Sequence, residues 1–130
     1  MPKPTKLFVV GLALICACGL LWAGGQPTAG PEKVTIGVSL PTQDVERWVR
    51  DKENLISEAA RQGAEIKIQI ANNDAARQIA QVENLLTAGI DVLMLAPHDA
   101  ESSATSVEAA KAAGVPVISY CRLVLNSDLD

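Results

Sequence analysis

Two short stretches of the sequence carry side chains that suit the binding of a small polar ligand. Arg47 and Trp48 are adjacent in the run ERW, and Cys121 and Arg122 are adjacent near the end of the sequence. A sugar presents a ring of hydroxyls with patches of C–H, so the donor fork of arginine and the apolar face of tryptophan both suit it. A simpler interpretation stays open, in which Trp48 packs in the core and Arg47 is merely solvated.

Catalytic chemistry has weaker support in the sequence. His98 and Cys121 each follow a predicted strand, and a thiol beside an imidazole can act as a nucleophile. No third group that would orient the histidine is visible, and a polar loop histidine with a small half-buried cysteine explains both residues equally well. Asp44 and Glu46 could begin an acidic phosphoacceptor pocket, but acids are also favoured at helix N-termini. We therefore expect that the protein is not an enzyme.

The sequence also argues against several kinds of partner. The turn PTQDVERW lacks the glycine pattern of a phosphate-binding loop, and no Cys/His spacing typical of a metal site is present, so we expect no cofactor and no metal. The formal net charge is −4, and Lys3 and Lys6 lie near the start, so the rest of the chain is still more acidic. Such an acidic domain lacks the basic surface that proteins use to bind nucleic acid.

The first thirty residues have the pattern of an export signal. Two lysines precede a long uncharged apolar run, and small and polar residues follow it. Ile15–Cys18 resembles a lipobox, which would attach a lipid to Cys18, whereas Ala23–Gly25 suits an ordinary signal peptidase. An uncleaved membrane anchor is a further alternative, although no basic cluster follows the run to retain it. We expect residues 1–30 to be a signal peptide or lipoprotein signal, and residues 31–130 to form one domain.

The remaining sequence alternates between strand and helix patterns. Strands are predicted at residues 34–40, 65–71, 91–96 and 117–120, and helices at about 45–62, 75–88 and 101–113. A glycine follows each predicted helix, as is common at helix ends. Such alternation predicts a parallel sheet with right-handed crossovers, and a central first strand gives the order 2-1-3-4. Ligands bind at the carboxyl ends of such strands, where both short stretches lie.

Over residues 32–130 the sequence resembles the amino-terminal lobe of the periplasmic sugar-binding proteins of bacterial ABC importers, in particular the D-xylose-binding type. The resemblance rests on VTIGVSLPTQDVERWVRDKENL, QIANNDAARQIAQVENLLTAGIDVLMLAPHDA and KAAGVPVISYCRLVLNSDLD. It implies a three-layer α/β fold of the periplasmic-binding-protein type, with the first lobe only. Members of the family continue into a second lobe, so we expect this chain to be a fragment or the product of a truncated gene.

The resemblance also implies a ligand site. Arg47, Trp48 and Arg122 match sugar contacts of the first lobe, and Cys121 stands where the family has an aspartate that accepts hydrogen bonds from sugar hydroxyls. A thiol is a weak donor and acceptor, so the cysteine is expected to weaken binding by roughly ten- to a few-hundredfold. Other residues match the family pattern in turn, helix-cap or pocket-rim positions: Asn72, Asp74, Gln78, Gln81 and His98.

The function implied by this resemblance is that of a substrate-binding subunit of a carbohydrate ABC transporter. It would bind a monosaccharide, the pentose D-xylose, in the cleft between two lobes, and its partner would be the membrane permease. The location would be the periplasm, or the outer face of the cell membrane if Cys18 carries a lipid. Two alternatives stay open: a sugar-sensing module that partners a membrane histidine kinase, and a non-functional truncated remnant.

Overall fold

The computed structural model describes residues 33–129 of the chain. Seven elements alternate along these residues: β1 (Thr35–Leu40), α1 (Glu46–Gln62), β2 (Glu65–Ile70), α2 (Ala75–Thr87), β3 (Val92–Leu95), α3 (Ala104–Ala112) and β4 (Val117–Ser119). The predicted signal segment, residues 1–30, lies outside the described residues. Within the described part of the chain, no helix has both the length and the apolar character needed to cross a membrane.

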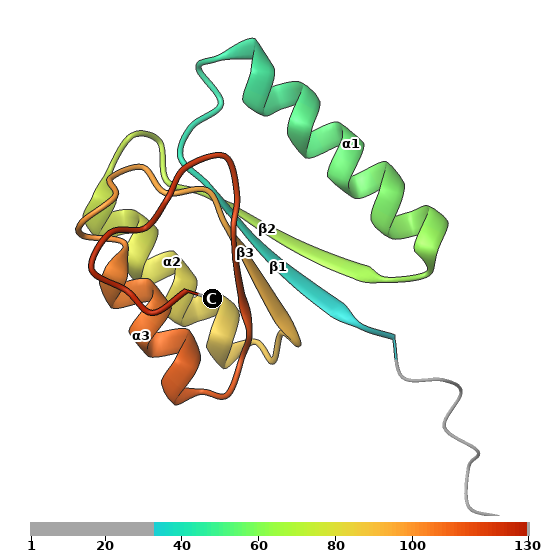
Figure 1. Ribbon diagram of the computed structural model, residues 1–130. Coiled ribbons are helices and arrows are strands. Elements are labelled where there is room, and N and C mark those ends of the chain that lie inside the picture. Colours follow the sequence, from blue (N-terminus) through green and yellow to red (C-terminus); the bar gives the residue numbers. More distant parts are fainter. Residues whose placement is uncertain (1–32, 130) are drawn as a thin grey trace, which may run out of the picture. The chain divides into compact units, whose positions relative to one another are not determined.

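The four strands form one parallel sheet in the order β2-β1-β3-β4, which confirms the predicted order. The register aligns Val38 of β1 with Ile68 of β2 and with Met94 of β3, and Met94 in turn with Ile118 of β4. Helix α1 lies on one face of the sheet, whereas α2 and α3 lie on the other (Figure 1). The described residues therefore form three layers.

The helix ends follow from local sequence. Helix α1 ends at Gly63, which adopts the left-handed conformation with φ of 73° and donates its N–H to the last turn. Asp74 caps α2 by accepting a hydrogen bond from the Arg77 backbone N–H at 2.9 Å, as predicted. Helix α3 begins three residues later than predicted, because Ser102 and Ser103 form turns that bond to Asp99 instead.

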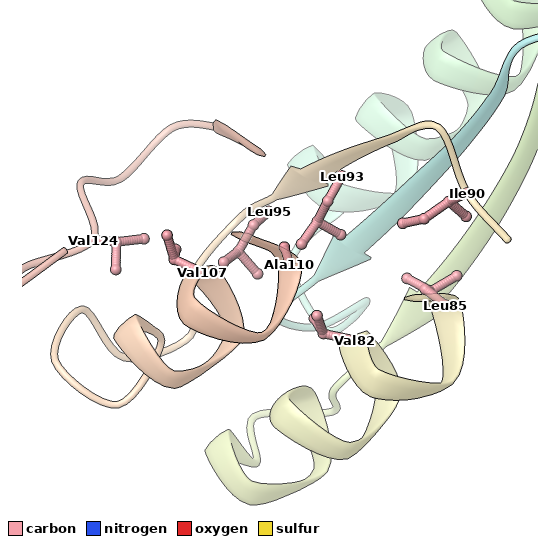
Figure 2. Close-up of a cluster of buried hydrophobic side chains, with 8 residues drawn as sticks. All are labelled: Val82, Leu85, Ile90, Leu93, Leu95, Val107, Ala110 and Val124. Carbon is pink, nitrogen blue, oxygen red and sulfur yellow. The ribbon is translucent and has the colours of Figure 1, made fainter. Parts of the chain in front are cut away.

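One hydrophobic core fills the space between the sheet and the helix pair α2–α3 (Figure 2). Leu93 and Leu95 of β3 are fully buried there, because alternate residues of a strand point to the same face. Helices α2 and α3 contribute apolar side chains at helical spacing, and the tail contributes Val124. The buried members are Val82, Leu85, Ile90, Leu93, Leu95, Val107, Ala110 and Val124.

A second core lies on the α1 side of the sheet. Val38 and Leu40 of β1 are fully buried there, together with Trp48 of α1 and Ala96. Burial decreases toward β4, where Ile118 is 51% exposed, and Met94 of β3 is only half-buried. Helix α1 packs mainly against β2, so β3 is fully covered on the α2–α3 side alone.

A glycine in the central strand allows a close approach beneath the sheet. A Cβ added at Gly37 would lie 2.5 Å from Cδ1 of Ile90, well inside van der Waals contact. We expect Gly37→Ala to lower the free energy of unfolding by about 1–3 kcal/mol. Adding Ile90→Val removes Cδ1, so urea denaturation of the double variant should show less destabilisation than the sum of the single changes. Strictly additive effects would contradict the proposed clash.

Candidate functional site

The segments that follow β1, β3 and β4 are joined at one edge of the sheet. The Ala96 N–H donates to the Ser39 carbonyl at 2.9 Å, and the Tyr120 N–H donates to the Leu95 carbonyl at 2.8 Å. These bonds extend the parallel ladders past the ends of the strands. The side chains predicted to bind a ligand therefore belong to neighbouring segments at the carboxyl ends of the strands, which we call the carboxyl edge.

Arg47 lies at the start of α1 with half of its side chain exposed. Its guanidinium lies over the Trp48 ring, 5.0 Å from the centroid, and its Nε is 3.4 Å from an Asp51 carboxylate oxygen. The pKa of Arg47 is raised, first by its interaction with the Cys121 sulfur and then by the Tyr120 hydroxyl. The same Asp51 oxygen accepts from the Tyr120 hydroxyl at 3.0 Å, so Arg47 lies beside the segment that contains Tyr120 and Cys121.

Trp48 occupies a different environment from its neighbour. It is only 5% exposed and belongs to the core on the α1 side. Its ring meets Tyr120 edge to face, with centroids 6.3 Å apart and planes inclined by 70°. The burial of Trp48 agrees with the interpretation that it packs in the core. Contact between Trp48 and a ligand stays a prediction.

Cys121 and Arg122 begin the tail that follows β4. Cys121 is exposed and has a left-handed backbone with φ of 69°, a conformation in which asparagine and aspartate are enriched. Arg122 donates from Nη1 to the carbonyls of His98 at 3.0 Å and Pro97 at 3.3 Å, and its own carbonyl accepts from the Ser119 hydroxyl. Arg122 is thereby tied to the loop after β3.

Two residues of this edge were not predicted from the sequence. The Tyr120 hydroxyl donates to an Asp51 carboxylate oxygen at 3.0 Å, and the same oxygen faces Arg47. The i,i+4 spacing of Arg47 and Asp51 was a signal that could have identified Asp51. Burial raises the pKa of Tyr120 first, and the hydrogen bond to Asp51 and its negative charge raise it further.

The Asp51 contact can be tested through the pKa of Tyr120. We expect Asp51→Ala to lower this pKa toward the ordinary value of 10.0, because the acceptor and the negative charge that disfavour the phenolate are both removed. Tyr120 is the only tyrosine of the chain, so a spectrophotometric phenolate titration reports on it alone. Glu58→Ala, on the same helix, is the control and should leave the pKa unchanged. An unchanged or higher pKa in Asp51→Ala would contradict the contact.

Polar contacts also join the loops after β1 and β2. The Asp44 carboxylate accepts from the Thr42 hydroxyl at 3.0 Å and from the Asn73 amide at 2.8 Å. Val45 occupies the N-cap position of α1, and Glu46 is the acid of its first turn. Asp44 therefore acts as a link between two loops, in addition to lying near a helix N-terminus.

The other polar residues predicted at this edge have structural partners. Gln81 donates to the Ile70 carbonyl at 3.0 Å, and Asn72 adopts a left-handed turn conformation with φ of 53°. His98 is half-buried beside Pro97. Across residues 33–129, no group of three or more His, Cys, Asp or Glu side chains is arranged to hold a metal ion.

A parallel α/β lobe with hydrogen-bond donors and arginine side chains at the carboxyl ends of its strands is typical of proteins that bind small ligands there. Residues 36–129 match the model of the periplasmic binding protein domain, and the chain belongs to that family. The family was expected from the sequence, and the match confirms it.

Individual relatives extend this result. The chain is 37% identical over 103 residues to the D-xylose-binding periplasmic protein of Haemophilus influenzae. The matched region covers 79% of this chain and 31% of that protein. It is similar to a carbohydrate transporter solute binding protein from Chloroflexus aurantiacus solved in complex with D-glucose, with 37% identity and a TM-score of 0.71, covering 75% of this chain and 29% of the other.

A third relative belongs to a different kind of system. The fructose-binding periplasmic domain of a hybrid two-component system is 29% identical, with a TM-score of 0.64, and the match covers 74% of this chain and 32% of that one. The chain thus spans about a third of the length of the relatives it matches.

Proposed function

We propose that the chain binds a monosaccharide, D-xylose, at the carboxyl edge of its sheet, as one lobe of the solute-binding subunit of an ABC importer. The observation that carries the proposal is that Arg47, from the segment after β1, and Tyr120, from the segment after β4, share the carboxylate of Asp51. The 37% identity to a D-xylose-binding protein supports the choice of sugar. The partner is the membrane permease, and closure against a second lobe buries the ligand.

The hydrogen-bond donors of the edge suit the hydroxyl oxygens of a sugar. A guanidinium has five N–H donors and no acceptor. Arg47 is half exposed, and its contacts with Asp51 and with the Trp48 ring leave N–H donors available. Arg122 adds a second exposed cation, whose bonds within the described residues all come from Nη1. The donor groups that remain can bind hydroxyl oxygens of a pyranose.

The proposal includes export and a division of the chain. Residues 1–30 direct secretion, residues 31–130 form the lobe, and the location is the periplasm or, through a lipid on Cys18, the outer face of the membrane. No catalytic role is assigned to any residue, since the proposed work of the lobe is to hold and release a sugar.

The test is a direct binding measurement. NMR titration of the chain with D-xylose, D-ribose and D-glucose should give weak binding that favours D-xylose. Arg47→Met should reduce that binding about tenfold or more, because a hydrogen bond from a charged group to the sugar is lost. Arg61→Met is the matched control, since Arg61 pairs with Glu58 at the other end of α1. Equal losses in both variants, or no binding of any sugar, would overturn the proposal.

A second candidate is a sensory role. It is favoured by the likeness to the fructose-binding domain of a hybrid two-component system. The neighbouring genes discriminate between the two roles, because permease and ATPase genes accompany an importer and a histidine-kinase gene accompanies a sensor. Retained export without binding of any sugar would instead favour a non-functional remnant.

A further inference from the structure

Gln78 is a buried polar side chain that joins three separate segments. It lies in the first turn of α2 with 1% of its surface exposed. Its amide nitrogen donates to the Ser39 hydroxyl at 3.0 Å and to the Ala96 carbonyl at 2.9 Å. Its amide oxygen accepts from the His98 backbone N–H at 2.8 Å. One carboxamide therefore ties α2 to the end of β1 and to the chain that leaves β3.

The segment held by Gln78 in turn holds Arg122. The carbonyls of Pro97 and His98 accept hydrogen bonds from Nη1 of Arg122. His98 is thus fixed by Gln78 through its N–H and fixes Arg122 through its carbonyl. The His98 N–H that Gln78 holds belongs to the same peptide unit as the Pro97 carbonyl, and the Ala96 carbonyl that Gln78 also holds belongs to the preceding unit.

We infer that Gln78 is a positioning residue for the ligand-binding edge, which acts by orienting the carbonyls that hold the Arg122 side chain. As far as sugar affinity is concerned, this inference rests on the proposed function. An arginine side chain has many rotamers, and ordering it on binding opposes association. Gln78 reduces this entropic cost, because it fixes the carbonyls of Pro97 and His98 that hold Arg122 before the ligand binds.

A purely structural role for Gln78 predicts something different. If the carboxamide serves only to satisfy buried polar groups, its loss should reduce stability without altering the order of Arg122. The side-chain Nε–H signal of Arg122 distinguishes the two, because its NMR relaxation reports on the motion of the guanidinium. Amide hydrogen exchange at His98 reports separately on the bond to Gln78.

The first variant is Gln78→Met, which keeps the length of the side chain and removes all three hydrogen bonds. We expect His98 amide exchange to become roughly tenfold faster or more, the Arg122 Nε–H signal to become mobile, and D-xylose affinity to fall. Val82→Ala is the matched control, since Val82 lies on the same helix, is fully buried and packs in the hydrophobic core against α3 and the sheet. It should lose stability without releasing Arg122.

The second variant is Gln78→Glu, which tests the hydrogen bonds by titration. The pKa of a buried carboxyl is raised, by as much as ~4 units. When protonated it has one donor and one acceptor and can replace the carboxamide in part, whereas the ionised form repels the Ala96 carbonyl. Arg122 order and sugar affinity should therefore recover as the pH is lowered. The wild-type chain, measured over the same pH range, is the control for every other pH-dependent group.

The outcomes separate this inference from the proposed function. An Arg122 signal as ordered in Gln78→Met as in the wild type, or a flat pH profile in Gln78→Glu, would overturn the inference even if D-xylose binds. Release of Arg122 in a chain that binds no sugar would support the positioning role while overturning the proposed function.

Discussion

Replacing Cys121 with aspartate is expected to tighten D-xylose binding by about ten- to a few-hundredfold, because a charged acceptor contributes roughly 1.5–3 kcal/mol more than none. The thiol is exposed and directly follows Tyr120, whose hydroxyl shares the Asp51 carboxylate with Arg47. A carboxylate at that position would accept hydrogen bonds from sugar hydroxyls and orient the guanidinium of Arg47. The left-handed backbone of residue 121, with φ of 69°, also favours aspartate over cysteine.

The measurement is an NMR or calorimetric titration of both proteins with D-xylose. Cys121→Asn is the matched control, since asparagine has the same shape and backbone preference but no charge, and it should recover only part of the gain. An affinity that stays the same in Cys121→Asp would show that this position has no part in sugar binding. A gain of the same size in Cys121→Asn would assign the effect to the backbone conformation.

Removing the Trp48 ring is expected to have the largest effect on stability. Trp48→Ala should lower the free energy of unfolding by about 3–5 kcal/mol, because it empties a large part of the core between α1 and the sheet. Val38, Leu40 and Ala96 would lose their main partner from α1. Chemical denaturation followed by circular dichroism gives this quantity, and a loss below about 1 kcal/mol would contradict the core role.

Trp48→Phe separates the core role from the predicted ligand role. Phenylalanine retains most of the apolar ring and its edge contact with Tyr120, but it has no indole N–H. If Trp48 donates to the sugar, this variant should fold and bind D-xylose more weakly. If the ring is only part of the core, affinity should stay close to that of the wild type.

The order of the strands followed from local patterns in the sequence. Alternating strands and helices leave few topologies for a parallel sheet, and the predicted order 2-1-3-4 placed the strand at residues 65–71 at the sheet edge. The structure confirms this, since β2 is an edge strand and pairs only with β1 within the described sheet. Helix ends at Gly63 and a cap at Asp74 were predictable for the same reason, because each depends on a few adjacent residues.

The direction of side chains at the site could not be predicted in this way. Arg47 and Tyr120 are separated by most of the domain, and only the folded structure shows that both meet the Asp51 carboxylate. Asp51 lies within the helix predicted at about 45–62, and only the folded structure shows its contacts with Tyr120 and Arg47. Ile56 has the helical spacing of a core residue but is 44% exposed, so periodicity alone did not define the extent of the buried face.

The central claim is that the edge containing Arg47, Cys121 and Arg122 binds a pyranose. It is tested most directly by mapping backbone and side-chain NMR shifts of the chain as D-xylose is added. The account predicts that the shifts concentrate at residues 43–48, 97–98 and 120–122 and saturate with a single affinity. Shifts confined to the opposite ends of the strands, or none with any pentose or hexose, would contradict it.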